Sequence, residues 1–365
     1  MDESFLDKKT DERKQAGALR RLTANNGKTD FCSNDYLGIV KNKLIEKIIP
    51  GDLSHGSTGS RLLSGNYRLI EETEEAIASF HESPAALIFN SGYDANTGIL
   101  SCVPQKGDAI LYDQLSHASI RDGIRLSFAA AFSFLHNDAA DLEKKLSVAR
   151  ESSQNIFVVT ESVFSMDGDR APLAAMVPVC KKYNAALITD EAHATGVTGE
   201  RGEGLVQHLG LQKDCFARIH TFGKACGCHG AAIAGSEKLK QYLVNFSRQF
   251  IYSTALPESA AAAIAASYKI FPSLKKERAY IQKLTALFQN TAIRYEKLKS
   301  DTPIQVVVIP GNEEVKKIAG VLQENKIDVR PILYPTVPKG KERLRIVLHA
   351  FNTEEELYKL LALLS

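Results

Sequence analysis

Residues 221–230, Thr-Phe-Gly-Lys-Ala-Cys-Gly-Cys-His-Gly, place a lysine directly after an apolar run that spans Phe216 to Phe222. The run predicts a buried strand, and the glycines around Lys224 would let a flat ligand approach the backbone closely. Partial burial would lower the pKa of this lysine and make its neutral amine available as a nucleophile or base. These properties suit a lysine that carries pyridoxal 5'-phosphate (PLP) as a Schiff base. A lone lysine is more often a solvated surface charge, so the motif needs support from elsewhere in the chain.

A carboxylate and a histidine provide that support, in the sequence Asp-Glu-Ala-His at residues 190–193 after the apolar run Ala185 to Thr189. PLP chemistry needs a carboxylate against the pyridine nitrogen, because a protonated ring accepts electrons from a substrate carbanion. Asp190 is placed for this role, and His193 for a hydrogen bond to the phenolic oxygen of the ring. The alternatives are a helix N-cap for Asp190 and an ordinary turn histidine for His193.

Apolar runs alternate with helix-length segments through the middle of the chain. This alternation predicts an α/β fold with a mostly parallel sheet covered on both faces, and ligands of such sheets bind beyond the carboxyl ends of the strands. A dinucleotide-binding dehydrogenase is the alternative fold, but the chain lacks its glycine fingerprint. The seven predicted strands are Ala85–Phe89, Asp108–Tyr112, Ala130–Leu135, Asn155–Thr160, Ala185–Thr189, Phe216–Phe222 and Ala231–Ala234.

Further candidate site residues follow these predicted strands. Gly92 and Tyr93 open a helix directly after a strand, where free amides and the helix dipole suit a phosphate group. Thr221 stands three residues before the lysine and can give its hydroxyl to the same phosphate. His117 and Ser165 come after two other strands; taken alone, His117 is a helix-terminus histidine.

The C-terminal part predicts a smaller α+β unit. We expect an N-terminal helical segment (1–36), a large domain (37–267) and a small domain (268–365), with one long helix over Glu277–Lys299. The sequence Arg-Leu-Arg-Ile at 343–346 alternates, so one arginine should face inward, where it could bind a carboxylate bidentately. The other elements expected here are strands Ile304–Ile309, Val329–Leu333 and Leu344–Leu348 and helices Glu313–Asn325 and Thr353–Leu364.

Composition narrows the class of protein. The formal net charge of +2 gives no case for nucleic acid or an anionic membrane surface. No apolar run approaches the roughly 20 residues that span a bilayer, and the first ten residues lack the apolar core of a signal peptide. The six cysteines are scattered without the spacing of a metal site. We expect a cytoplasmic protein without a metal.

The two motifs at 190–197, Asp-Glu-Ala-His-Ala-Thr-Gly-Val, and 220–224, His-Thr-Phe-Gly-Lys, resemble those of the α-oxoamine synthases, PLP-dependent enzymes of fold type I. The resemblance runs from about Asn34 to His349. It implies a large domain with a mostly parallel seven-stranded sheet, a small C-terminal α+β domain and PLP bound through Lys224.

The resemblance also implies roles for individual residues. His117 would stack on the pyridine ring, and Ser165 would lie near its phenolic oxygen. Thr254 would reach the phosphate of the neighbouring subunit, which implies a homodimer with a shared active site. Asn34 would lie near the carboxylate of the amino acid, and Arg345 would bind it. Of the two arginines at 20–21, we select Arg21 as a candidate for an anionic substrate tail, against the alternative of a solvated helix charge.

The activity implied is a decarboxylative condensation of an amino acid with an acyl-CoA. The wording at 192–196 favours L-alanine with a pimeloyl thioester, a step of biotin synthesis, but members that join glycine to acetyl-CoA or serine to palmitoyl-CoA share nearly all the motifs. A PLP-dependent aminotransferase would not account for His117 or residues 162–169. A catalytically silent paralogue would be expected to lose Lys224 or Asp190, and both are present.

Overall fold

The computed structural model describes residues 2–24 and 27–365, which form two compact units. The sheet unit comprises residues 37–165 and 170–278, and the terminal unit comprises residues 1–36, 166–169 and 279–365. This grouping differs from the expected boundary at 267/268, because helix α10 (Glu258–Ile270) packs on helix α2 and the Arg278 guanidinium donates to the carbonyl of Phe271 at 2.6 Å. The N-terminal segment groups with the C-terminal residues because strand β1 pairs with strand β11.

A seven-stranded sheet forms the centre of the sheet unit, with strand order β2-β8-β7-β6-β5-β3-β4. Six strands run in one direction, and β8 is antiparallel to both of its neighbours. The predicted mostly parallel sheet is confirmed. Its strands are β2 (Ala85–Phe89), β3 (Ala109–Asp113), β4 (Ala130–Phe134), β5 (Ile156–Glu161), β6 (Ala186–Asp190), β7 (Ala217–Thr221) and β8 (Ala231–Gly235).

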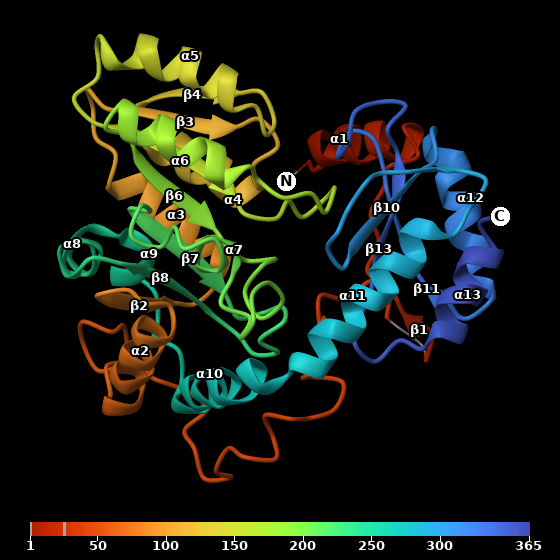
Figure 1. The fold of residues 1–365 in the computed structure, drawn as a ribbon, viewed down its shortest axis with the longest axis horizontal. Helices are drawn as coiled ribbons and strands as arrows, with labels where there is room; N and C mark the ends of the chain where they lie inside the picture. Colours follow the sequence, from red (N-terminus) through yellow and green to blue (C-terminus); the bar gives the residue numbers. More distant parts are fainter. Residues whose placement is uncertain (1, 25–26) are drawn as a thin grey trace. The chain divides into compact units, whose positions relative to one another are not determined.

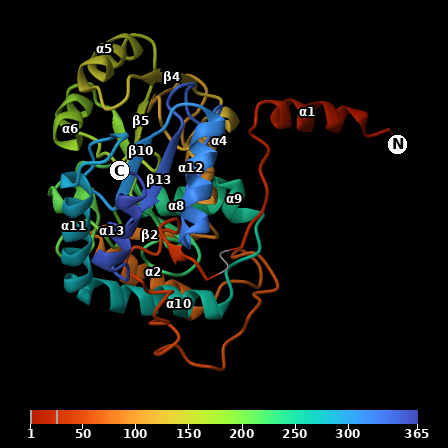
Figure 2. The same cartoon turned by 90° about the vertical axis from the view of Figure 1, so that its right-hand side faces the viewer.

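Helices cover the sheet on both sides, with α5 and α6 on one side and α4 and α9 on the other (Figures 1 and 2). The central strands read as largely apolar runs because both of their faces are buried, and β5 and β6 have no exposed residue. The remaining helices of this unit are α2 (Arg68–Phe80), α3 (Gly92–Cys102), α4 (Ala118–Leu126), α5 (Ala139–Arg150), α6 (Leu173–Lys182), α7 (Leu205–His208), α8 (Glu237–Phe246), α9 (Arg248–Ile251) and the 3-10 turn η1 (Phe271–Ser273).

The terminal unit is built on an antiparallel four-stranded sheet of order β12-β13-β10-β9, with a separate parallel pair of β1 and β11. Helices α12 and α13 pack against the sheet through leucines such as Leu322 and Leu360. Thr353 and Glu356 form a capping box that begins α13. The elements are α1 (Ser4–Gln15), β1 (Thr29–Asp30), β9 (Glu296–Lys297), β10 (Ile304–Val308), α12 (Asn312–Glu324), β11 (Ile327–Asp328), β12 (Arg330–Ile332), β13 (Arg343–Val347) and α13 (Glu354–Ala362).

The long helix expected over Glu277–Lys299 is wrong at its C-terminal end. Helix α11 spans Lys275–Asn290, and the chain then forms the short strand β9, whose Lys297 is opposite Val307 of β10. Ile293 and Tyr295 pack against the core of the terminal unit instead of continuing the helix. Burial of these β-branched and aromatic side chains overrides the helical tendency of the charged residues around them.

Candidate active site

The lysine and the histidine of the two motifs meet at the carboxyl edge of the large sheet. Lys224 follows β7 and His193 follows the neighbouring strand β6, and Lys224 Nζ lies 2.8 Å from His193 Nε2. His193 is buried, whereas Lys224 is half-buried. Parallel neighbouring strands end at the same edge of a sheet, so this contact follows from the topology.

Asp190 is the last residue of β6, and its carboxylate is buried and fixed from two sides. The backbone amide of Ala192 donates to Asp190 Oδ1 at 2.9 Å, and Asn96 Nδ2 donates to Asp190 Oδ2 at 2.7 Å. Asn96 also donates to Ser119 Oγ at 3.1 Å. Each carboxylate oxygen keeps a further lone pair, so Asp190 can still accept a hydrogen bond from an N–H group of a ligand.

His117 lies at the N-terminus of α4, where its Nδ1 accepts from the amide of Ser119. Its backbone amide donates to Glu161 Oε1 at 2.7 Å, which fixes the turn. The side chain keeps an exposed face, as a stacking role requires. The protein around its other side desolvates the imidazolium and lowers the pKa of His117, and the charge of Asp190 opposes this shift.

Glu161 is a buried carboxyl group that the sequence analysis does not assign. It ends β5 directly opposite Asp190 in the register of β5 and β6. Burial raises the pKa of Glu161 to about 8, and the negative charge of Asp190 acts in the same direction while Lys224 opposes it. The edge of the sheet therefore carries two carboxyl groups in different environments.

The start of helix α3 has the features of a phosphate cradle. Ser91 caps the helix by accepting from the amide of Asp94. A Cβ atom added at Gly92 would lie 2.3 Å from Thr221 Oγ1, so only glycine fits against this hydroxyl. Tyr93 exposes 46% of its surface and its hydroxyl donates to Asp122, which leaves its backbone amide as its contribution to the first turn.

This set of groups fits PLP. A fixed carboxylate suits the ring nitrogen, an amine suits the aldehyde carbon, and the first turn of α3 with the Thr221 hydroxyl suits the phosphate. Ser165, expected near the phenolic oxygen, is half-buried in the turn after β5.

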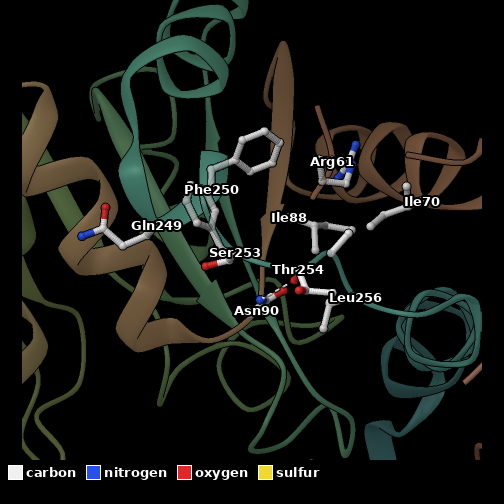
Figure 3. Close-up of a pocket in the computed structure, with 11 residues that line it drawn as sticks. Arg61, Ile70, Ile88, Asn90, Gln249, Phe250, Ser253, Thr254 and Leu256 are labelled. Atoms are coloured by element: carbon white, nitrogen blue, oxygen red, sulfur yellow. Dashed lines mark hydrogen bonds between the residues drawn. The ribbon is translucent and has the colours of Figure 1, made fainter. Parts of the chain in front are cut away.

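Thr254 lies at the edge of a small cavity in the sheet unit, shown in Figure 3. Its side chain is exposed, and its carbonyl accepts from Asn90 Nδ2 at 2.9 Å. The cavity has a volume of about 10 Å³, room for about one water molecule, and is bordered by Arg61 and Phe250. The side chain of Thr254 is therefore accessible at the surface of the sheet unit.

The terminal unit brings Asn34 and Arg345 together. Arg345 Nη2 donates to Asn34 Oδ1 at 3.0 Å, and the hydroxyl of Tyr36 donates to the same oxygen at 3.2 Å. Tyr36 is fully buried, which raises its pKa to about 12, so it remains a neutral donor. The segment is fixed by His349, whose Nε2 lies 3.0 Å from the carbonyl of Ser33.

The expectation that only one of the two arginines on β13 faces inward is wrong, because residues two apart on a strand point to the same face. Arg343 is the more buried and pairs with Asp167. Arg330, directly opposite Arg345 on β12, pairs with Asp328 at 2.7 Å. Asp167 thus pairs with Arg343 and Asp328 with Arg330, and Arg345 donates to the side chain of Asn34.

Arg21 lies in the exposed coil after α1. Its neighbour Arg20 donates a hydrogen bond from Nη2 to Thr336 Oγ1 at 3.2 Å. Among the described residues, no helix is long and apolar enough to cross a bilayer, and no cluster of His, Cys, Asp or Glu is arranged to hold a metal ion.

The sequence and the structure are each similar to known proteins over nearly the whole chain. The family model described as aminotransferase class I and II matches residues 26–364. An 8-amino-7-oxononanoate synthase of Marinobacter nauticus is 40% identical over 377 residues, covering 98% of this chain and 95% of the relative. A serine palmitoyltransferase of S. paucimobilis, solved with a PLP–myriocin aldimine, superposes with a TM-score of 0.86 at 26% identity, covering 99% of this chain and 96% of that one. An 8-amino-7-oxononanoate synthase of Francisella tularensis superposes with a TM-score of 0.77 at 29% identity, covering 93% and 97%.

Proposed function

Because the chain belongs to the aminotransferase class I and II family of PLP-dependent enzymes, and because its relatives confirm the resemblance to α-oxoamine synthases, we propose that it condenses L-alanine with a pimeloyl thioester. The products would be 8-amino-7-oxononanoate, carbon dioxide and the free thiol, and the step would belong to biotin synthesis. The chain is a PLP-dependent enzyme of the kind that transfers an acyl group, as its family and relatives show.

The observation that carries the proposal is the convergence of Lys224, His193 and Asp190 at the carboxyl ends of β6 and β7. When bound, PLP supplies an electron sink for the pair of electrons released at the amino acid Cα. Asp190 would keep the ring nitrogen protonated, and His193 would donate to the phenolic oxygen. The Lys224 amine would take the proton from Cα and return one after carbon dioxide has left.

We propose that His117 stacks on the ring of the cofactor, that Ser165 lies near its phenolic oxygen, and that Gly92, Tyr93 and Thr221 hold its phosphate. His117 offers an exposed imidazole face beside Glu161, and Gly92 leaves space against Thr221 Oγ1. These contacts would fix the plane of the cofactor ring and the position of its phosphate. The amine of Lys224 would then face a single carbon of the bound substrate.

Arg345 and Asn34 would bind the carboxylate of the amino acid. In support, Arg345 Nη2 donates to Asn34 Oδ1, which sets a guanidinium and an amide side by side. A guanidinium binds a carboxylate through two parallel hydrogen bonds, which orients the substrate as well as holding it. Arg21 stays a candidate for the anionic tail of the acyl donor.

Thiol release by the PLP-loaded protein tests the substrates. L-alanine, glycine and L-serine are each paired with pimeloyl-, acetyl- and palmitoyl-CoA, and free thiol is measured over time. Release only with L-alanine and pimeloyl-CoA supports the proposal. A preference for serine and palmitoyl-CoA, which the similarity to serine palmitoyltransferase makes the second candidate, would replace the substrates and retain the chemistry.

We also propose a homodimer in which Thr254 contacts the phosphate site of the other subunit. Thr254 is exposed and stands two residues after Tyr252, which exposes 72% of its surface, so this segment is open to contact with a second subunit. Sedimentation that gives a monomer at micromolar concentration would contradict this. A cytoplasmic location is supported by the six cysteines, all of which are free thiols.

A further inference from the structure

Two histidines are completely buried beside the candidate active site and have no role in the chemistry above. His81 follows helix α2, and His220 lies on β7 four residues before Lys224. Their rings are stacked, with centroids 3.6 Å apart and planes inclined by 15°. Two imidazoles at this distance cannot both be charged without strong repulsion.

Both rings are neutral. Burial lowers the pKa of each histidine well below its usual value, and the charge of Arg218, whose Nη2 donates to the carbonyl of His81, adds to the effect. Arg201 acts on His81 in the same direction, whereas interactions with Gln207 and the backbone of Glu203 oppose it without reversing it. The other titratable group in contact is Tyr268, whose pKa burial raises well above its usual value, so it too is neutral.

The hydroxyl of Thr195 determines which nitrogen of His220 carries the proton. Thr195 Oγ1 donates its single hydrogen to the carbonyl of Glu191 at 2.9 Å. The same oxygen lies 2.9 Å from His220 Nδ1, so it accepts there and Nδ1 must be the donor. Nε2 of His220 is buried without a hydrogen-bond partner, which costs less for a bare acceptor than for an unpaired N–H.

His81 is held on its other side by Tyr268, whose hydroxyl lies 2.9 Å from His81 Nε2. Its Nδ1 is buried without a hydrogen-bond partner among the described residues. The stack therefore places a second neutral imidazole, His81, against the face of the ring that donates to Thr195.

The bond between His220 and Thr195 joins the two segments that carry the cofactor residues. Thr195 belongs to the turn after β6 that contains Asp190 and His193, and His220 precedes Thr221 and Lys224 on β7. We propose that His220 is a positioning residue: donating to Thr195 and held by its stack on His81, it sets the distance between His193 and Lys224 at the PLP site. This inference rests on the assignment of Asp190, His193 and Lys224 to PLP made above.

A matched pair of variants at position 195 tests it. Thr195→Val keeps the shape and removes the hydroxyl, whereas Thr195→Ser keeps the hydroxyl. His220→Phe keeps a ring that can stack and removes the donor, and His220→Asn keeps a donor close to Nδ1. Tyr268→Phe is the control, because it removes a hydrogen bond from the same buried cluster without touching the turn at 190–196.

The first readout is the titration of the absorption band of lysine-bound PLP, measured without substrates. We expect Thr195→Val and His220→Phe to weaken PLP binding by about 10-fold, the effect of one buried unpaired group, and to shift the midpoint of the titration. We expect kcat to fall by a similar factor of about 10 while the amino-acid KM changes less than about twofold. Thr195→Ser, His220→Asn and Tyr268→Phe should keep the wild-type midpoint. If Thr195→Val and His220→Phe kept the PLP affinity and the titration midpoint of the wild type, the proposal would be overturned.

The second readout needs no cofactor. In the PLP-free protein labelled with ¹⁵N-histidine, both rings should stay neutral from about pH 6 to pH 8, and His220 should give the nitrogen shifts of the Nδ1–H tautomer. An Nε2–H tautomer for His220, or a ring that gains a proton in this range, would overturn the proposal. A wild-type protein that fails to bind PLP would instead refute the proposed function, so the two failures are distinguishable.

Discussion

Replacing Glu161 by glutamine should change how the stability of the protein depends on pH. Glu161 is 3% exposed, and burial together with the charge of Asp190 raises its pKa from 4.5 to about 8. The folded protein therefore keeps this carboxyl group protonated at pH values where the unfolded chain has lost the proton. Because the unfolded state binds fewer protons above about pH 4.5, the free energy of unfolding falls as the pH rises towards 8.

The size of the effect follows from the shift. Each pKa unit corresponds to about 1.4 kcal/mol, so the wild-type protein loses up to about 5 kcal/mol from this group between pH 4.5 and pH 8. Glutamine cannot ionise, and its Oε1 can still accept from the amide of His117. The difference in stability between Glu161→Gln and the wild type should therefore grow in favour of the variant by about 1.4 kcal/mol per pH unit.

Urea unfolding of the PLP-free protein, followed by circular dichroism, measures this difference. Midpoints are compared at four values between about pH 5 and pH 8, with Glu46→Gln as the control because Glu46 is exposed. The Glu46→Gln variant should follow the wild type throughout. If Glu161→Gln also ran parallel to the wild type across this range, the raised pKa of Glu161 would be refuted.

Three further substitutions test separate parts of the site. Lys224→Ala should reduce turnover by at least about 100-fold while the circular dichroism spectrum is retained, and substantial activity in it would remove the lysine from the chemistry. Gly92→Ala should weaken PLP binding by about 10-fold or more, because its Cβ would lie 2.3 Å from Thr221 Oγ1; unchanged affinity would show that no phosphate sits there. Arg345→Gln should raise the amino-acid KM by about 10-fold to 100-fold with an unchanged PLP spectrum, and an unaltered KM would assign the carboxylate to another residue.

The sequence predicts the sheet and the motif residues for a local reason. Each of the seven strands is a largely apolar run; Asp190 is the last residue of β6, and Lys224 comes three residues after the end of β7. Since parallel strands end at a common edge, the pattern predicts that Asp190 and Lys224 lie at one edge of the sheet, and the observed pairing of β6 with β7 then brings Lys224 to His193.

The supporting residues could not be predicted in this way. Asn96 reaches Asp190 across 94 positions of the chain, and Glu161 reaches the amide of His117 across 44. Their partners depend on which strands become neighbours, and the hydrophobic periodicity of a single segment does not predict the order of strands in the sheet. Their signal was polarity at places where burial is expected: Glu161 ends an apolar strand, and Asn96 lies on a buried helix.

The two arginines of β13 show a second kind of contact that the sequence pattern does not predict. Alternation correctly separates Arg343 and Arg345 from Leu344 and Ile346, but both arginines then share one face. Partners distant in the sequence then distinguish them, because Arg343 pairs with Asp167 and Arg345 donates to Asn34.

The central claim is that the protein joins an acyl group to Cα and removes the carboxyl group of the same amino acid. The most direct measurement uses L-alanine with ¹³C in its carboxyl group, together with pimeloyl-CoA, and compares labelled carbon dioxide with free thiol. We expect one labelled carbon dioxide for each thiol with the wild-type protein, and neither with Lys224→Ala. Thiol without carbon dioxide would indicate hydrolysis of the thioester, and pyruvate in place of both would indicate transamination; either result would contradict the proposed function.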